Sequence, residues 1–265
     1  MRKRIGIALL LCCLLLLFTS GCSGISEAQK SQSSPAANIT EVGTQSAAET
    51  AIQIAGEENK YLFLIFYKQG DSKSEEMKQV ADQAQKEIAE KANVVYIDSS
   101  DDSEQALMRK IGIDESIVPI TVVIAPNGAI VIGFAQEVSI QDLQNSFVSP
   151  KMAEILKTMQ DGKLVFLYVA NPGMEYYEEN LTTIQETAEG DFPDSSRIVE
   201  VDPGDAGASD VIKRCKIEVP VSETNLLILN GGYIMGTLAG KIDKQALLEA
   251  STAACSGGSC CPTAE

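Results

Sequence analysis

The sequence predicts an α/β protein built from two tandem copies of one unit, each a mixed sheet flanked by helices. Three observations lead to this prediction. The body reads as one pattern written twice, each copy alternates helical and strand periodicities, and each copy holds an Asn-Gly pair between two apolar runs. A strand, a helix and a further strand favour a parallel pair joined by a right-handed crossover, whereas a tight turn adds antiparallel strands. Each copy should therefore form a mixed sheet with helices on both faces.

The repeat extends over most of the body. Residues 93–98 match residues 197–202, and residues 107–113 match residues 211–217, both 104 residues further along. The other matching pairs are 60–67 with 163–169 and 122–134 with 226–237. A tandem duplication explains this agreement, and it predicts one domain at 46–148 and a second at 149–251.

Each copy is expected to run helix, strand, helix, strand, helix, two hairpinned strands, helix. Apolar residues recur at the spacing of one helix face in both copies; they are Met77, Val80, Ala81, Ala84 and Ile88 in the first, and Leu181, Ile184 and Ala188 in the second. The pairs Asn127-Gly128 and Asn230-Gly231 are typical hairpin turns. Both copies close with an amphipathic segment, marked by Ile140, Leu143 and Phe147 or by Ile242, Leu247 and Ala250.

This order of elements, together with ESIVPITVVIAPNG at 115–128, resembles the thioredoxin fold over residues 46–251. The resemblance implies a proline before the first hairpin strand, usually in the cis form and facing the active site. Pro119 is the cis-proline candidate in the first copy, although a loop proline before an edge strand is the alternative. Pro220 is the candidate in the second copy, where two more residues separate it from the Asn-Gly turn.

The thioredoxin resemblance implies a Cys-x-x-Cys pair at the start of the second helix, where the helix dipole favours a thiolate. Asp71 and Ser74 stand there instead, and residues 168–179 of the second copy contain no cysteine either. No cysteine occurs from residue 23 to residue 214. The domains should therefore not exchange thiols at the usual place, and Asp71 and Ser74 are expected to cap the helix start.

Composition excludes several classes of function. The chain has no histidine, which excludes Ser-His and Cys-His catalysis as well as imidazole metal sites. Its net charge of −16 argues against nucleic acid as a partner. We predict no catalytic and no cofactor-binding residue in the domains. Cys215 takes the place of the apolar Ile111 in the repeat, and is expected to pack as a small core residue.

The N-terminal residues resemble a bacterial lipoprotein signal. A basic head at residues 2–4 and an apolar run at 5–18 precede TSGC at 19–22, and this run is shorter than the roughly 20 residues that span a membrane. Residues 1–21 are predicted to be the signal peptide and Cys22 the lipidated residue, with an ordinary signal peptide as the alternative. Residues 22–45, rich in Ser, Ala and Gln, are predicted to be a flexible linker.

The C-terminal tail at 252–265 concentrates thiols in a Gly/Ser-rich segment. Cys255, Cys260 and Cys261 lie within seven residues of one another. Three thiolates without imidazole suit Cu(I), Zn(II) or a thiophilic metalloid, so these cysteines are candidate ligands for a soft ion. A small disulfide loop between Cys255 and Cys260 in an oxidising envelope is an alternative, as is an adventitious disulfide.

Two hypotheses of function follow. The first is a cell-envelope lipoprotein, anchored by lipid on the extracytoplasmic side of the cell membrane, whose tandem domains form a scaffold for an envelope protein partner and whose tail binds a soft metal or metalloid. Such domains would resemble the redox-inactive thioredoxin-like domains of protein disulfide isomerases. The second hypothesis is a thiol-disulfide oxidoreductase that uses the tail cysteines. Because Cys-x-x-Cys is missing, we favour the first hypothesis, in which the protein is not an enzyme.

Overall fold

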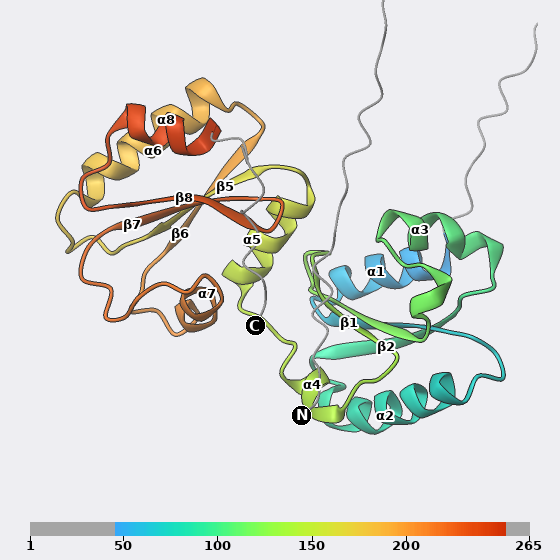
Figure 1. Cartoon of the computed structure of the whole chain (residues 1–265). Helices are drawn as coiled ribbons and strands as arrows, with labels where there is room; N and C mark the ends of the chain where they lie inside the picture. Colours follow the sequence, from blue (N-terminus) through green and yellow to red (C-terminus); the bar gives the residue numbers. More distant parts are fainter. Residues whose placement is uncertain (1–45, 253–265) are drawn as a thin grey trace, which may run out of the picture.

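The structure is a computed structural model of the whole chain and describes residues 46–252 (Figure 1). The described residues form two units, each with its own four-stranded sheet. The first unit comprises α1 (Ala47–Glu57), β1 (Tyr61–Tyr67), α2 (Ser72–Ile88), β2 (Ala92–Asp98), η1 (Asp102–Glu104), α3 (Gln105–Lys110), η2 (Glu115–Ile117), β3 (Ile120–Ile124), β4 (Ile130–Ala135) and α4 (Ile140–Gln144). The second unit comprises α5 (Pro150–Gln160), β5 (Leu164–Val169), α6 (Tyr177–Asp191), β6 (Ser196–Val201), α7 (Ala208–Arg214), β7 (Asn225–Asn230), β8 (Tyr233–Ala239) and α8 (Lys244–Thr252).

Both sheets have the same topology. The strand order is β2-β1-β3-β4 in the first sheet and β6-β5-β7-β8 in the second. The first two strands of each unit pair in parallel, whereas the hairpin strands pair antiparallel to each other and to the central strand. Two mixed α/β sheets flanked by helices confirm the predicted fold class.

The central strands β1 and β5 are apolar throughout because helices cover both of their faces. Residues 62–66 and residues 165–169 are almost completely buried. In the first unit, α1 and α3 pack on one face of the sheet, and α2 and α4 on the other (Figure 1). In the second unit, α5 and α7 pack on one face, and α6 and α8 on the other.

Local capping determines where several helices begin. Ser46 forms a capping box with Glu49 at the start of α1. Ser149 caps α5, and Pro150 stands in its first turn. Such side chains accept hydrogen bonds from backbone N–H groups that have no partner inside the helix. The described helices include none that is long and apolar enough to cross a membrane.

Residues that join the two units make direct hydrogen bonds. The Tyr61 hydroxyl donates to the carbonyl of Val148 at 2.7 Å and accepts from its N–H at 3.2 Å. One residue further on, the N–H of Ser149 donates to the carboxylate of Asp210 at 2.7 Å. The connection therefore has fixed partners in both units, the first at β1 and the second at α7.

Candidate functional site

The candidate site lies at the end of each sheet where the central strand leads into the next helix. In the first unit, the pairings of Phe66 with Ile120 and of Ile120 with Ala135 bring three segments to this end. These segments are the start of α2, the residues before β3 and the residues after β4. In thioredoxin-like proteins this is the place expected for the redox pair.

Asp71 and Ser74 hold the start of α2 through mutual hydrogen bonds. The carboxylate of Asp71 accepts from both the hydroxyl and the N–H of Ser74, each at 2.8 Å. These two bonds, the hydroxyl bond first, keep the pKa of Asp71 below its usual value. Ser74 is fully buried, and its hydroxyl accepts from the N–H of Lys68 at 3.1 Å. The predicted capping role is confirmed for Asp71 and was wrong for Ser74, which lies inside the first turn and accepts from a residue before the helix.

Gln136 connects the start of α2 to the proline loop of the first unit, and we call this connection the Gln136 bridge. Its side-chain amide donates to the carbonyl of Val118 at 2.8 Å and accepts from Lys73 Nζ at 2.9 Å. Its own N–H donates to the carbonyl of Pro119 at 2.7 Å. Gln136 adopts a left-handed backbone with φ of 68°, and the Val118–Pro119 peptide bond is cis. The carbonyl before the proline is therefore already bonded within the chain.

The second unit holds a buried polar group, the Asn180 network, at the fourth residue of α6 rather than at the start of the helix. The amide of Asn180 donates to Thr224 Oγ1 at 2.9 Å and to the carbonyl of Gly240 at 2.7 Å, and its oxygen accepts from the N–H of Ile242 at 2.8 Å. Thr224 Oγ1 also donates to the carbonyl of Gly240 at 2.8 Å. Both Asn180 and Thr224 are fully buried. The network ties helix α6 to the residues before β7 and after β8.

Pro220 does not occupy the place that Pro119 holds. The N–H of Gly240 bonds to the carbonyl of Thr224, as the N–H of Gln136 bonds to that of Pro119. Thr224 is thus the equivalent of Pro119, directly before the hairpin strand, and Pro220 lies four residues earlier. The Val219–Pro220 peptide bond is nonetheless cis. Pro220 is exposed whereas Pro119 is buried. The extra residues therefore place Pro220 away from the sheet.

An exposed apolar loop results at this end of the second unit. Val219 is 70% exposed and has no hydrogen-bond partner among the residues that the structure describes. Tyr176, directly before α6, lies at the same end of the sheet with a left-handed backbone. Lys241 Nζ lies 5.8 Å from the centre of the Tyr176 ring and 2.6 Å from the carboxylate of Glu179. The loop packs through Ile217 and Val221 on the α5 and α7 face of the sheet, whereas Tyr176 leads into α6 on the other face.

Cys215 is the one free cysteine in the described part of the chain, and it does not belong to either site. It follows the last residue of α7 just as Ile111 follows α3, and both pack partly buried against their sheets. Burial raises the pKa of the Cys215 thiol to about 11. The thiol is therefore protonated at neutral pH and is a poor nucleophile.

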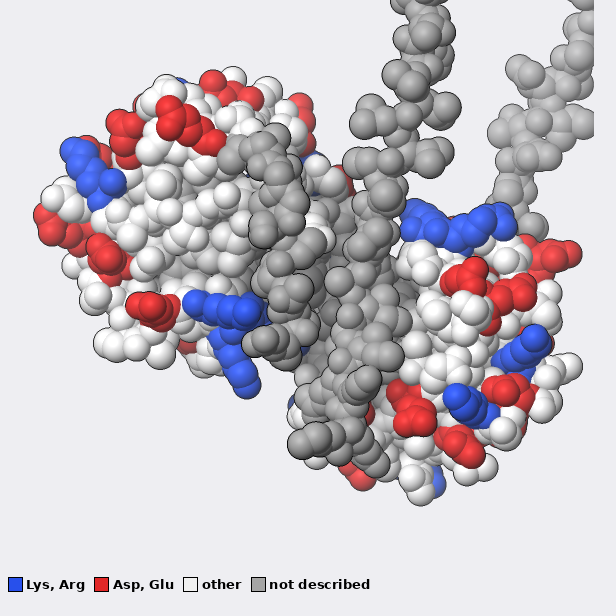
Figure 2. Space-filling model, in the orientation of Figure 1, with Lys and Arg blue, Asp and Glu red and all other residues white. Residues whose placement is uncertain are grey.

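The predicted lipidation and metal-ligand residues, Cys22, Cys255, Cys260 and Cys261, lie outside the described residues. Within residues 46–252, no three His, Cys, Asp or Glu side chains group as a metal site. Acidic and basic side chains are distributed over both units in the face shown in Figure 2. The region of the second unit where Figure 1 draws β7 and β8 is largely free of charge there.

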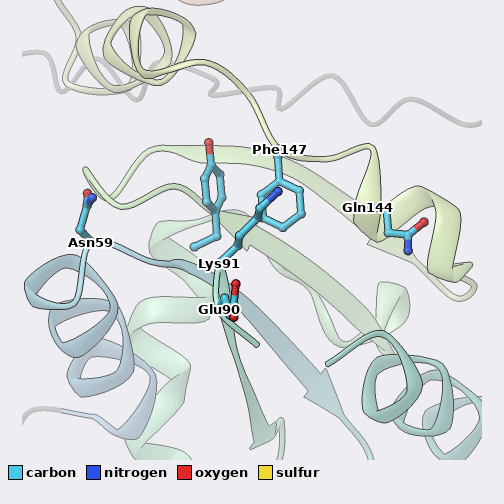
Figure 3. A pocket seen from close by; sticks show the side chains of 6 residues that line it. Asn59, Glu90, Lys91, Gln144 and Phe147 are labelled. Carbon is cyan, nitrogen blue, oxygen red and sulfur yellow. The ribbon is translucent and has the colours of Figure 1, made fainter. Parts of the chain in front are cut away.

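A shallow pocket opens at the other end of the first sheet (Figure 3). It has a volume of about 460 Å³ and is lined by Asn59, Tyr61, Glu90, Lys91, Gln144 and Phe147. The Tyr61 and Phe147 rings meet edge to face with centroids 4.8 Å apart. Because Tyr61 begins β1 and α2 starts after β1 ends, the pocket is about 20 Å from the candidate site, at roughly 3.3 Å per strand residue.

Sequence reasoning missed Gln136 and Asn180, the residues that fill the two places. Both are ordinary polar residues whose partners lie far along the chain, so neither forms a local motif. A signal for Gln136 does exist in the repeat. Gly240, 104 residues later, has φ of 66° beside 68° for Gln136. A glutamine aligned with a glycine after a hairpin indicates a left-handed position whose side chain is held by other contacts.

Comparison with known proteins identifies the type of the first unit. A family model described as "Thioredoxin-like domain" matches residues 37–148. No curated protein matches the chain. The fold of the described residues is thioredoxin-like, with two mixed sheets that are consistent with tandem domains.

Solved structures that resemble the chain do so at low identity. The NTD_N/C domain of alkylhydroperoxide reductase AhpF from Enterococcus faecalis is 18% identical, with a TM-score of 0.28, and the match covers 76% of this chain and 98% of that one. Human ERp44 is 12% identical with a TM-score of 0.34, over 77% of this chain and 56% of that one. The thioredoxin Deadhead from Drosophila melanogaster is 20% identical with a TM-score of 0.31, over 38% and 90%.

Proposed function

We propose that this protein is a cell-envelope lipoprotein whose two thioredoxin-like units act as a binding scaffold rather than as thiol-exchange catalysts. In this proposal, lipid on Cys22 holds the chain at the extracytoplasmic side of the membrane, and the tail cysteines bind a soft metal or metalloid. The observation that carries the scaffold is the same in both units. Side chains already bonded within the chain hold this end of each sheet, and no cysteine stands at the start of α2 or α6.

The bonding at these places argues for a structural rather than a catalytic role. In the first unit, Asp71 and Ser74 satisfy each other, and the Gln136 bridge covers the carbonyl before Pro119. In the second unit, the Asn180 network uses its donors and acceptors internally. Neither place offers a thiol or an imidazole, and a buried group whose hydrogen bonds are satisfied has little tendency to react.

The loop around Val219 is the surface best suited to a partner. It presents an apolar side chain and, at Val219, a backbone that no residue within 46–252 bonds, and such segments pair readily with an extended polypeptide. The first unit has no such exposed loop before its hairpin, because Pro119 is buried and the carbonyl of Val118 is bonded to Gln136. We therefore infer that the second unit carries the binding surface.

Val219→Asp should weaken binding of an extended polypeptide to the full chain by about tenfold, because it places a carboxylate at the centre of the contact. The probe is a fluorescently labelled polypeptide that is permanently unfolded by reduction and alkylation, so it cannot form a disulfide. Fluorescence anisotropy measures its dissociation constant.

Ile132→Asp is the matched control, since Ile132 is 40% exposed on β4 and far from the Val219 loop in sequence and in sheet. It should leave the dissociation constant unchanged. Equal affinity of the wild type and Val219→Asp, or no binding by the wild type, would contradict the proposed scaffold.

Substitution tests the roles proposed for the cysteines outside the described residues. The reduced full chain should bind one Cu(I). Its affinity for Cu(I) should decrease as the pH is lowered, because thiols must lose protons to become ligands. Removal of residues 253–265 should abolish binding, and Cys215→Ser should not alter it.

Cys22→Ala should release the protein from the membrane fraction.

A second candidate function, thiol-disulfide exchange by the tail, rests on the clustering of Cys255, Cys260 and Cys261. It predicts reduction of insulin disulfides by the full chain, and a stalled mixed disulfide with a partner when Cys260 or Cys261 is replaced by serine. A chain that binds Cu(I) but leaves insulin intact supports the first proposal. The reverse result supports exchange, and inactivity in both assays overturns both roles of the tail.

A further inference from the structure

The two units meet where the first hairpin packs against the first helix of the second unit. Ala129 and Ala125 pack with Ala153 of α5 in a buried apolar cluster. The side-chain amide of Asn127, in the hairpin turn, donates to the carbonyl of Ala153 at 2.8 Å. Figure 1 shows α5 on the side of the second unit that faces the first.

Gln160 of α5 extends this contact along the outer edge of β4. Its amide oxygen accepts from the N–H of Ile130 at 2.9 Å, and its amide nitrogen donates to the carbonyl of Ile130 at 2.7 Å. A side-chain amide thus pairs with the strand as a neighbouring strand would. Hairpin and helix form one interface with an apolar centre and a polar rim.

The second unit repeats the hairpin side of this interface without a helix on it. Ile130 and Ile234 hold the same position, each paired with the residue next to the bulge in its hairpin. Ile234 is 49% exposed, and Tyr233, the equivalent of the buried Ala129, is 38% exposed. The hairpin from Asn230 to Ile234 carries no charged residue. Among residues 46–252, no helix therefore covers the equivalent hairpin of the second unit.

The first unit repeats the helix side. Helices α1 and α5 are both first helices capped by a serine, and Ile52 faces its core as Ile155 does. At the same spacing, Thr50 corresponds to Ala153 and Ile54 to Lys157. Thr50 is a small residue on the exposed face, and Ile54 is 45% exposed although it is a large apolar side chain. Helix α1 of the first unit thus exposes the face that corresponds to the docking face of α5.

We propose that two copies of this protein associate head to tail, with the second hairpin of one copy on helix α1 of the next. The contact uses the same hairpin and helix elements as the interface within one chain, with Tyr233 in the place of Ala129 and Glu57 in the place of Gln160. Large apolar side chains are exposed on both surfaces, at Ile54 and at Tyr233 and Ile234, which is unusual for surfaces that stay solvated. Because the two surfaces differ, the contact is heterologous, and each added copy exposes the same pair of surfaces again.

Charge sets the strength of this association. Each copy has a net charge of −16, so copies repel one another at low ionic strength. The contact itself is small and uncharged on the hairpin side. We expect weak association that becomes stronger when salt screens the repulsion.

Sedimentation velocity of the full chain over a range of concentrations tests the proposal. The wild type should show a sedimentation coefficient that rises with concentration. Ile54→Asp and Ile234→Asp should each weaken the association by about tenfold or more, because each places a carboxylate at an apolar contact. Both substitutions are at exposed positions, and circular dichroism verifies that the variants are folded.

The decisive sample is an equimolar mixture of the two variants. Each variant keeps one intact surface, so the mixture should form dimers and no longer species, although each variant alone stays monomeric. Ile132→Asp, at an exposed isoleucine outside both surfaces, should associate like the wild type.

A wild type that stays monomeric at every concentration overturns the proposal. So does association that is unaffected by Ile54→Asp, since symmetric pairing of two β8 edges would not involve α1. Failure of the mixture to form dimers would equally show that the two surfaces do not meet.

Discussion

Asn180→Ala should lower the free energy of unfolding of the second unit by about 3 kcal/mol. Asn180 is fully buried, and its side chain makes three hydrogen bonds to the segments on either side of the hairpin. The alanine leaves the N–H of Ile242 buried without an acceptor and opens a small cavity beside Thr224. Both effects destabilise the folded state without a compensating gain in the unfolded chain.

Urea unfolding of the full chain, followed by circular dichroism, measures this loss. The matched control is Asn225→Ala, since Asn225 is only partly buried and its side chain makes one bond, to the carbonyl of Glu223 at 2.8 Å. The control should cost less than about 1 kcal/mol. Equal effects of the two substitutions would mean that the Asn180 network does not hold this end of the unit together.

Gly236→Ala should lower the free energy of unfolding by about 2 kcal/mol, because the added methyl group collides with helix α8. A Cβ at position 236 would lie 2.8 Å from the Cβ of Ala250 and 3.6 Å from its Cα. The Cβ of Ala250 is fixed to the helix backbone, so α8 must move away from β8 to relieve the 2.8 Å contact. The close approach of helix and strand at this point therefore requires glycine.

Two further variants separate this clash from other effects of the substitution. Adding Ala250→Gly removes the colliding methyl group and should recover most of the loss, less the cost of about 1 kcal/mol or below for a glycine near a helix end. Gly190→Ala makes the same change in α6, where a Cβ meets nothing within 4 Å; it should stabilise the protein by about 0.5–1 kcal/mol. If Gly236→Ala is neutral, α8 does not pack as closely on β8 as described.

The sequence determined by itself the element order and both hairpins. The spacing of apolar residues indicates which faces of an element are buried. It distinguishes the strands at 61–67 and 164–169, which are buried on both faces, from the helices that cover them, which are buried on one. The Asn-Gly turns lie where predicted, with left-handed glycines at Gly128 and Gly231. The absence of thiols at the start of α2, and its capping by Asp71, could also be read from the residues, because a cap acts within a single turn of helix.

Only the tertiary structure decided what fills the two candidate places. The bond of Lys73 to Gln136 joins residues 63 positions apart, and the bond of Asn180 to Thr224 joins residues 44 positions apart. Such partners leave no periodic or local signal, since any polar residue at the right point in space could serve. The displacement of Pro220 from the sheet has the same origin, because the number of loop residues does not tell which one meets Gly240.

The contact between the units could likewise not be predicted from the sequence. Asn127 has the same hairpin role as Asn230 in the repeat, yet of the two only Asn127 bonds to a helix within residues 46–252. The difference arises because a second unit follows the first hairpin in space. The sequence specified each unit through short-range patterns of burial, turns and caps, whereas the bonds between distant residues depend on geometry that exists only after both sheets have formed.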